Sequence, residues 1–569
     1  MASPQFPEPP PTLPETPRER VDDYLSRLTL SKASWPQVGL GERIELLEEC
    51  AEAVVRVGDR WVEAAARAKG IEPTSELVGE EWLGGPMTTV RNIRLLIDTL
   101  KAGGQPKPPQ VSEHPNGQKI AQVFPGDLTD KILFTGFTAE VWIEPGKPAS
   151  QGKIYREKAN NDSPNRGKVS LILGAGNVAS IGPMDCLYKL FAEDEVTLLK
   201  TNPVNAYLGP FIEEAFAPLV RKDLFFVVHG GAEQGQYLTS HPKIDTIHIT
   251  GSDKTHDVIV WGSRDEQEQR KREGRPQLNK PISSELGCVT PVFVVPGPWT
   301  NSELEYQAEH VAGMIGNNGS FNCNAAKVLV LAKNWHLRDE FRRRVHRSLS
   351  RLPTRKAYYP GAKERYQSFL DAYPNSVALS SGGDEIIPWT VIPDVPATSG
   401  EYALTNEAFC GIVAEINIDA ADAPEYLEKA IPFGNDEIWG NLSCIMLVHP
   451  QTQKDHSELV EQAISDLRYG GIGINCWAGL IYGMCVTTWG AYPGNPLSDI
   501  RSGRGVVHNT YLFDHPEKSV VRAPFIIRPK PVWAAGHRNL AKLGKRLTEF
   551  EAKPSVLKLT RVIGSALQG

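Results

Sequence analysis

Cys323 and Glu285 are the two residues of this sequence whose side chains could carry covalent chemistry together. Glu285 lies in KPISSELGCVTP and Cys323 in GNNGSFNCNAAKVLVL. A cysteine thiol becomes a strong nucleophile when it loses its proton, and a neighbouring carboxylate can accept that proton or activate a water molecule. Each residue borders an apolar, strand-like run, so a compact fold could bring them together. The pair therefore predicts a site that forms and hydrolyses a thioester.

The composition is that of an ordinary globular protein and excludes several classes of function. The chain has 569 residues, of which 41% are hydrophobic and 23% are charged, with a net charge of −7. This length predicts two or more domains. The negative net charge gives no reason to expect a nucleic acid as partner. No apolar run approaches the roughly 20 residues that an integral membrane helix needs.

The eight cysteines are scattered along the chain without CxxC pairs or histidines at zinc-binding spacing. In a chain of this length, that distribution predicts reduced thiols and a cytoplasmic location. It favours neither a disulfide framework nor a metal site. Most of the thiols are expected to pack in the core, and at most one or two to be chemical.

The order of apolar runs predicts an α/β protein. Residues 41–70 form an amphipathic helical pattern, and VSLILG, EVTLLK, LFFVVHG and TIHITG then alternate with helix-like segments. A second alternating block follows, with PVFVV, a helix over 301–316, KVLVLA and a helix over 337–352. Strand–helix alternation at this spacing is typical of parallel sheets with right-handed crossovers.

Three further segments differ from this pattern. Residues 1–17 contain seven prolines and no apolar stretch, which predicts a disordered or arm-like leader and not a secretory signal. Residues 263–280 are densely charged and predict a solvated hairpin or helix. The tail from residue 532 is basic, and its leucines have helical spacing. Such a helix can lie on a membrane surface, but packing on its own or a neighbouring subunit is favoured.

A glycine motif follows the first strand of the alternating block. GAGNVAS fits G-x-G-x-x-A, which in a Rossmann fold lets the backbone approach a pyrophosphate. The next strand should then end in an acidic residue for the ribose, yet EVTLLK ends in Lys200. The motif alone does not establish a Rossmann site, and a glycine-rich tight turn is the favoured explanation.

Read together, these segments resemble the aldehyde dehydrogenase superfamily over about residues 40–515. The resemblance implies a Rossmann-type cofactor domain, an α/β catalytic domain and a small β bridging arm. In SSELG and GNNGSFNCNAAK it places the general base on Glu285 and the nucleophile on Cys323. In GAGNVASIGP it places the oxyanion-binding amide on Asn177.

The same resemblance implies a dinucleotide site for NAD or NADP. LLKTNPVNAYLGP places the adenosine-ribose contact on Lys200, and IDTIHITGS places the pyrophosphate on Gly251 and Ser252. NEAFCGIV places the nicotinamide ribose on Glu407 and the nicotinamide ring on Phe409. The resemblance implies no metal.

The sequence departs from the family pattern at several points. Ala175 and Gly176 replace the usual proline and aromatic residue before the asparagine. Pro203 stands where NAD-preferring members usually carry a glutamate, so that NADP is permitted. The interval from Gly319 to Cys323 is one residue longer than usual. The segment 263–280 resembles an insertion.

The expected organisation is a leader, two domains and a C-terminal arm, with the site in the cleft between the domains. The boundaries are 1–17 for the leader, 18–283 for the NAD(P) domain (interrupted by arm strands near 139–160), 284–510 for the catalytic domain and 511–569 for the arm and basic extension. Pairing the arm with a neighbour's sheet edge would give a homodimer or homotetramer.

The activity implied by the resemblance is NAD(P)-dependent oxidation of an aldehyde to a carboxylic acid. Two alternatives stay open: a CoA-acylating dehydrogenase or acyl-CoA reductase, and a non-catalytic structural subunit with this fold. Such CoA-dependent members generally lack the base, so Glu285 favours hydrolysis. The substrate cannot be identified. Asp185, near an expected tunnel position, suggests a polar or cationic substrate, although an acid in the first turn of a helix explains it better.

Overall fold

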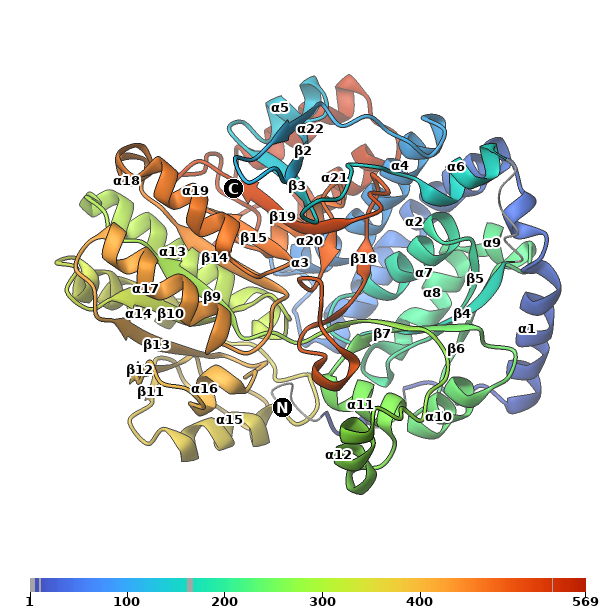
Figure 1. Ribbon diagram of the computed structural model, residues 1–569, viewed down its shortest axis with the longest axis horizontal. Helices are drawn as coiled ribbons and strands as arrows, with labels where there is room; N and C mark the ends of the chain where they lie inside the picture. Colours follow the sequence, from blue (N-terminus) through green and yellow to red (C-terminus); the bar gives the residue numbers. More distant parts are fainter. Residues whose placement is uncertain (1–5, 10–11, 161–166, 535) are drawn as a thin grey trace.

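The computed structural model has two lobes, and each is built on a β-sheet that is covered by helices (Figure 1). The structure describes residues 6–9, 12–160, 167–534 and 536–569. Each sheet has its own apolar core, one built around the first sheet and one around the second. The α/β class predicted from the alternating runs is confirmed.

The first sheet has six strands and contains the four short apolar runs of the first alternating block. Its spatial order is β17 (Gly503–Arg504), β8 (Ile282–Leu286), β7 (Thr246–Gly251), β4 (Lys168–Leu173), β5 (Glu195–Lys200) and β6 (Phe225–Val228). The strands from β8 to β6 run parallel, and β17 is antiparallel to β8. Parallel strands covered on both faces read as continuous apolar runs, as these do.

The strand order reverses between β4 and β7. From β4 the chain builds outward through β5 and β6, and then returns to add β7 and β8 on the other side of β4. In open α/β sheets, ligands bind outside the carboxyl ends of the strands at such a reversal. The segments that follow β4 and β7 are therefore the expected walls of a ligand site.

The second sheet has eleven strands and includes those of the predicted catalytic domain. Its order is β1 (Gln110–Glu113), β2 (Lys119–Phe124), β3 (Thr138–Ile143), β19 (Pro516–Arg522), β15 (Gly471–Ile474), β14 (Ser443–Leu447), β9 (Thr290–Val294), β10 (Ala326–Ala332), β13 (Ile412–Ile418), β12 (Thr390–Val395) and β11 (Val377–Ala378). The strands from β19 to β12 are parallel, and β1–β3 extend the sheet as an antiparallel ribbon.

The predicted arm segment 139–145 overlaps β3, which belongs to an antiparallel ribbon of this chain. β3 pairs with β19, and β19 pairs with β15 of the same chain, with Gly471 opposite Ser519. β1 forms the end of the sheet, and its residues are exposed. Pairing of the arm with a neighbour's sheet edge, and with it a homodimer or homotetramer, stays a prediction.

Helices cover both faces of the sheets. The longer ones are α1 (Arg18–Ser31), α2 (Leu40–Ala68), α4 (Thr88–Lys101), α7 (Ile181–Ala192), α10 (Ala232–Ser240), α11 (Asp253–Trp261), α12 (Arg264–Glu273), α13 (Asn301–Gly316), α14 (Arg338–Ser350), α15 (Ala362–Ala372), α17 (Ala423–Asp436) and α19 (Ser457–Asp466). α2 buries Leu47, Ala51 and Val54, as its periodicity predicts. The charged segment 263–280 contains the exposed helix α12.

The C-terminal extension is a helical hairpin that packs on its own chain. α21 (Leu540–Ala552) and α22 (Val556–Ala566) share a small core of Leu543, Phe550 and Val562. α21 lies against α3 (Val78–Trp82), η2 (Leu83–Met87) and α4. Within the described part of the chain, no helix combines the length and apolarity that a membrane crossing requires.

Candidate active site

Cys323 lies in a tight loop between α13 and β10. The loop begins with η4 (Asn317–Ser320), in which Asn318 and Ser320 adopt positive φ angles of 51° and 69°. Non-glycine residues in this conformation are strained, and they persist only where surrounding contacts hold them. Asn318 has such contacts, because its side-chain amide donates to the carbonyl of Phe321 at 3.3 Å and to Oδ1 of Asn322 at 3.0 Å. The loop thus presents Cys323 from a rigid frame.

Glu285 lies on β8 of the first, six-stranded sheet, next to the edge strand β17. Its backbone is opposite Thr250 on one side and Gly503 on the other. Gly503 has φ +122°, and a Cβ there would lie 2.0 Å from the carbonyl oxygen of Ser284, so only glycine allows β17 to approach. The expected domain boundary at 283/284 falls inside β8, which means that the first sheet carries the carboxylate and the second carries the thiol.

The structure brings these two side chains into contact across the cleft. The Cys323 thiol donates a hydrogen bond to Glu285 Oε1 at 3.1 Å. Burial raises the pKa of Glu285 to about 7, while the hydrogen bond from Cys323 and the nearby Trp489 indole limit the rise. Burial also raises the pKa of the Cys323 thiol, and the neighbouring Glu285 carboxylate raises it further. Both shifts favour a protonated thiol, and a carboxylate oxygen is positioned to accept its proton.

Asn177 lines the same cavity as Cys323 and Glu285. Its Nδ2 donates one hydrogen bond to the carbonyl of Phe321 at 3.0 Å, which leaves the second amide hydrogen for another acceptor. The backbone carbonyl of Asn177 accepts hydrogen bonds from Lys69 Nζ at 3.0 Å and from Asn318 Nδ2 at 3.1 Å. The turn after β4 is thereby tied to the cysteine loop.

Two buried lysines at this site were not among the residues singled out in the sequence. Lys327 Nζ donates to the carbonyls of Asn322 at 2.8 Å and Cys323 at 3.3 Å, and pairs with Glu407 Oε1 at 3.2 Å. Lys69 Nζ pairs with Glu81 Oε1 at 2.8 Å. A lysine at the head of an apolar strand, as in AKVLVLA, is the signal that could have identified Lys327.

Glu407 and Phe409 lie behind the cysteine loop. Burial raises the pKa of Glu407, and its pairing with Lys327 opposes the rise. Phe409 packs edge-on against Tyr359, with ring centroids 5.0 Å apart, and against Phe321 at 6.0 Å. Neither Glu407 nor Phe409 lines the cavity of Cys323; they belong to the neighbouring part of the cleft.

Lys200, Gly251 and Ser252 all lie at the carboxyl edge of the first sheet, at the end of β5 and at or directly after the end of β7. Lys200 ends β5, and burial lowers its pKa to about 8. Gly251 ends β7, and Ser252 caps α11 by accepting a hydrogen bond from the backbone N–H of Thr255. A helix start behind a strand end offers backbone N–H groups to a phosphate. These residues fit a dinucleotide at the strand-order reversal.

The described leader residues lie along this same cleft. The Thr16 N–H donates to the carbonyl of His229 at 3.0 Å. Glu8 accepts from the N–H of Ala232 at 3.5 Å, and its carboxylate opposes the lowering of the Lys200 pKa. Phe6 packs edge-on against Phe409, with centroids 5.3 Å apart. The arm-like interpretation of the leader thus applies to residues 6–9 and 12–17; residues 1–5 and 10–11 lie outside the described part.

Asp185, considered as a possible tunnel residue, does not line the cavity. It is buried on α7, where it accepts a hydrogen bond from Thr250 Oγ1 at 3.1 Å and faces His248 Nε2 at 3.6 Å. Burial raises the pKa of Asp185 well above its usual range. It is part of the packing between α7 and the sheet, so it gives no reason to expect a cationic substrate.

Comparison with known proteins agrees with this geometry. Residues 198–363 match the family model described as the aldehyde dehydrogenase family. A peroxisomal aminoaldehyde dehydrogenase 1 from Malus domestica is 25% identical over 266 residues, which are 43% of this chain and 46% of that protein. The match thus spans about half the length of this relative.

Solved structures match over nearly the whole chain. An NADP-dependent glyceraldehyde-3-phosphate dehydrogenase from Bacillus halodurans, complexed with NADP, superposes with a TM-score of 0.58 at 16% identity, covering 90% of this chain and 92% of its own. A Mycobacterium tuberculosis aldehyde dehydrogenase complexed with NAD+ gives 0.57 at 17% identity, covering 91% and 92%. The protein has the aldehyde dehydrogenase fold.

Proposed function

We propose that this protein oxidises an aldehyde to a carboxylic acid with NAD or NADP, using Cys323 as nucleophile and Glu285 as general base. The observation that carries the proposal is the 3.1 Å contact between the Cys323 thiol and Glu285 across the two sheets. A buried carboxylate with a pKa of about 7 has the affinity for a proton that a general base needs near neutral pH.

The residues would act in the following order. Glu285 accepts the thiol proton as Cys323 Sγ forms a bond to the aldehyde carbon. The oxygen of the resulting tetrahedral adduct carries the negative charge, and the free Nδ2 hydrogen of Asn177 is available to stabilise it. Oxidation leaves a thioester on Cys323. Glu285 passes the thiol proton to solvent and then takes a proton from a water molecule that attacks the thioester, so that the carboxylic acid is released and Cys323 leaves as a thiolate.

The dinucleotide would bind along the cleft beside this pair and supply the acceptor for the hydride. Lys200, Gly251 and Ser252 would hold its adenosine and pyrophosphate parts, and Glu407 and Phe409 its nicotinamide part. Pro203 begins the 3-10 helix after β5 and brings no carboxylate near Lys200. A 2′-phosphate would therefore meet no repulsion from this position, so that NADP is accepted as well as NAD.

The CoA-dependent alternative shares the reaction steps up to the thioester but needs no activated water. The Glu285 carboxylate, positioned against the sulfur, favours hydrolysis over thiolysis. The non-catalytic alternative would leave the buried pair without a chemical role, although burying an ionisable glutamate is costly.

The experiment that tests the proposal is a search for the acyl-enzyme. Wild-type protein is mixed with propanal and NAD or NADP, NAD(P)H is followed at 340 nm, and intact mass spectrometry is applied after an acid quench. We expect turnover without CoA, an acyl adduct on Cys323, and a loss of kcat of about 10³-fold or more in Cys323→Ala. Cys50→Ala, which changes a buried thiol of α2, is the matched control.

Three results would contradict the proposal. Turnover that strictly requires CoA would support the acylating alternative. An adduct on another residue would remove Cys323 from its role. The absence of turnover and of any adduct in the wild type, with dinucleotide binding intact, would support a structural subunit.

A further inference from the structure

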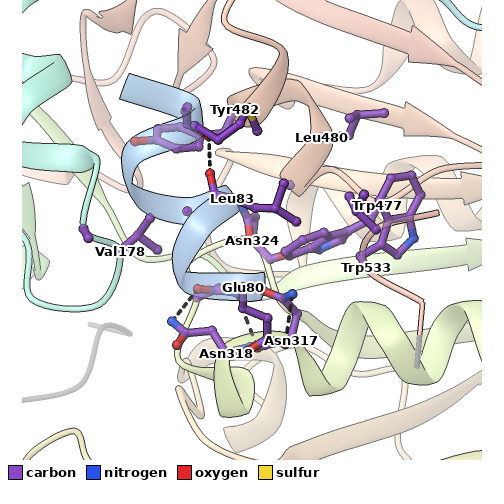
Figure 2. Close-up of a pocket in the computed structure, with 18 of the residues that line it drawn as sticks. Glu80, Leu83, Val178, Asn317, Asn318, Asn324, Trp477, Leu480, Tyr482 and Trp533 are labelled. Carbon is purple, nitrogen blue, oxygen red and sulfur yellow. Dashed lines mark hydrogen bonds between the residues drawn. The ribbon is translucent and has the colours of Figure 1, made fainter. Parts of the chain in front are cut away.

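The C-terminal extension closes the cavity that leads to Cys323. This cavity has a volume of about 190 Å³ and begins at Cys323, Glu285 and Asn177. Its outer wall includes Val532, Trp533, Leu547 and Glu551, all from the extension that follows β19. Figure 2 shows Trp477 and Trp533 on the same side of the pocket, across from Val178.

Close packing holds the extension in this position. A Cβ on Gly79 would lie 2.4 Å from the backbone carbon of Leu540, so α3 and α21 touch backbone to backbone at a glycine. A Cβ on Gly544 would lie 2.6 Å from Cβ of Trp82. This wall is therefore a fixed part of the fold.

A buried ion-pair network also holds the C-terminal extension in this position. Glu551 Oε1 lies 2.6 Å from Arg91 Nη1, and its Oε2 lies 2.7 Å from Arg94 Nε. Arg91 Nε also donates to the carbonyl of Met484 at 2.8 Å. These contacts join α21 to α4 and to α20 (Gly479–Met484), whose Leu480 and Tyr482 also line the cavity.

The lining between the catalytic pair and this wall is mainly apolar and aromatic. It includes Leu83, Met87, Trp477, Leu480, Tyr482 and Trp489. A lining of this kind favours a substrate that loses apolar surface to it. For scale, an apolar cavity of about 150 Å³ accommodates benzene.

The charged groups of the lining are already neutralised by one another. Glu81 pairs with Lys69 at 2.8 Å, Glu80 pairs with Arg355 at 2.9 Å, and Glu551 pairs with both Arg91 and Arg94. A carboxylated or phosphorylated aldehyde would find no cation without a partner among these groups. For the ammonium group of an aminoaldehyde, the one carboxylate of the described lining without a cationic partner would be Glu285, which acts as the base in the proposed reaction. A charged substrate would thus be desolvated without compensation.

We propose that the C-terminal extension is the specificity wall of this enzyme and selects neutral, apolar aldehydes about the size of an aromatic ring with a short side chain. Trp533 and Leu547 are the residues that would set this preference. The inference rests on the proposed aldehyde oxidation. It differs from the aminoaldehyde substrate that the name of the Malus domestica relative would suggest.

The test compares four aldehydes at the same dinucleotide concentration: phenylacetaldehyde, propanal, succinic semialdehyde and 4-aminobutanal. We expect kcat/KM for phenylacetaldehyde to exceed the values for the two charged aldehydes by about 100-fold or more, which is 2.7 kcal/mol. In Leu547→Trp, which narrows the cavity, phenylacetaldehyde should lose about 10–100-fold while propanal changes little. Trp533→Ala should lower the preference for phenylacetaldehyde over propanal.

Lys542→Ala, on the exposed face of α21, is the matched control and should leave the order of substrates unchanged. Equal or better turnover of a charged aldehyde would overturn the inference, as would an unchanged phenylacetaldehyde-to-propanal ratio in folded Leu547→Trp and Trp533→Ala. These outcomes leave the proposed function intact, because propanal is still oxidised. If none of the four aldehydes, propanal included, gives NAD(P)H or an acyl adduct, the proposed function itself fails.

Discussion

Glu285 and Cys323 are joined by a hydrogen bond from the thiol, and the environment of each sets how tightly it holds a proton. Burial raises the pKa of both groups, and the carboxylate is also near the sulfur, so the thiol holds the proton more tightly than the glutamate does. At neutral pH about half of the Glu285 population is ionised, since its pKa is about 7. Loss of this charge below pH 7 removes the base on which both proton transfers depend.

We therefore expect kcat to fall about tenfold per pH unit below pH 7, where Glu285 becomes protonated. Glu285→Gln should remove this dependence and slow both proton transfers, so that kcat falls by about 10²–10⁴-fold. Stopped-flow absorbance at 340 nm between pH 5.5 and 8.5 measures both effects. Glu268→Gln, on exposed α12, should behave like the wild type. A pH profile that is identical in Glu285→Gln and wild type would exclude the glutamate as the base.

The residues around this pair differ in how well a sequence can reveal them. Cys323 and Glu285 could be selected because each borders a strand-like run and has a reactive side chain. Asn318 and Lys69 could not be selected in this way. Asn318 depends on a positive φ angle, and Lys69 reaches Asn177 from α2 across more than a hundred positions of sequence. Their roles depend on tertiary contacts that no local pattern encodes.

At the scale of elements, the strands were predictable and the position of the C-terminal hairpin was not. VSLILG, EVTLLK, TIHITG and KVLVLA became β4, β5, β7 and β10, because buried parallel strands need continuous apolar runs. The helical spacing of Leu540, Leu543, Leu547 and Phe550 predicted α21. Its docking on α3 and α4 depends on the contact at Gly79 and on Glu551, neither of which has a distinctive sequence signal.

The Glu551 network gives the hairpin a measurable contribution to stability. Burial alone would raise the pKa of Glu551, but Arg91 and Arg94 outweigh burial and lower the pKa. Because the pKa is lower in the folded state, this contribution is present above the usual glutamate range and is lost as the pH falls through the lowered value. Glu551→Gln should leave two arginines without their carboxylate and cost about 3–5 kcal/mol of unfolding free energy at pH 7.

Chemical denaturation at pH 7 and at pH 3 checks this prediction. The difference between Glu551→Gln and wild type should be smaller at pH 3, which lies below the ordinary glutamate pKa, because the unfolded chain then already binds this proton. Lys542→Ala should stay within about 0.5 kcal/mol of wild type at both values. A Glu551→Gln protein as stable as wild type at pH 7 would mean that the network does not hold the hairpin.

At the scale of the whole molecule, the described leader residues and the arm strand both pack against other parts of the same chain. The arm strand β19 joins β15 of its own chain, and the inter-subunit pairing inferred from the sequence stays a prediction. The prolines of residues 1–17 predicted an extended leader, but not its course along the cleft. Thr16 and Glu8 contact the first lobe, and Phe6 contacts Tyr359 and Phe409 of the second. Such long-range partners are set by the assembled surface and not by local propensity.

The course of the leader leads to a prediction about the dinucleotide. Phe6 packs against Phe409, and Glu8 lies near Lys200, so the leader competes for the surfaces proposed to hold the two ends of the cofactor. A protein whose binding-competent state is only partly populated has its apparent affinity reduced by that fraction. Deleting residues 2–14 should therefore lower the KM and Kd for the dinucleotide by about tenfold, or roughly 1.4 kcal/mol, without changing kcat.

Phe6→Ala should have an effect in the same direction and of smaller size, since it removes one contact of the leader and leaves Glu8 in place. Glu19→Ala, on the exposed side of α1, is the control that should not change the affinity. Titration of NAD or NADP by quenching of tryptophan fluorescence gives Kd directly, and steady-state kinetics with propanal gives KM. An unchanged or weaker affinity after deletion would show that the leader supports the cofactor site and does not compete for it.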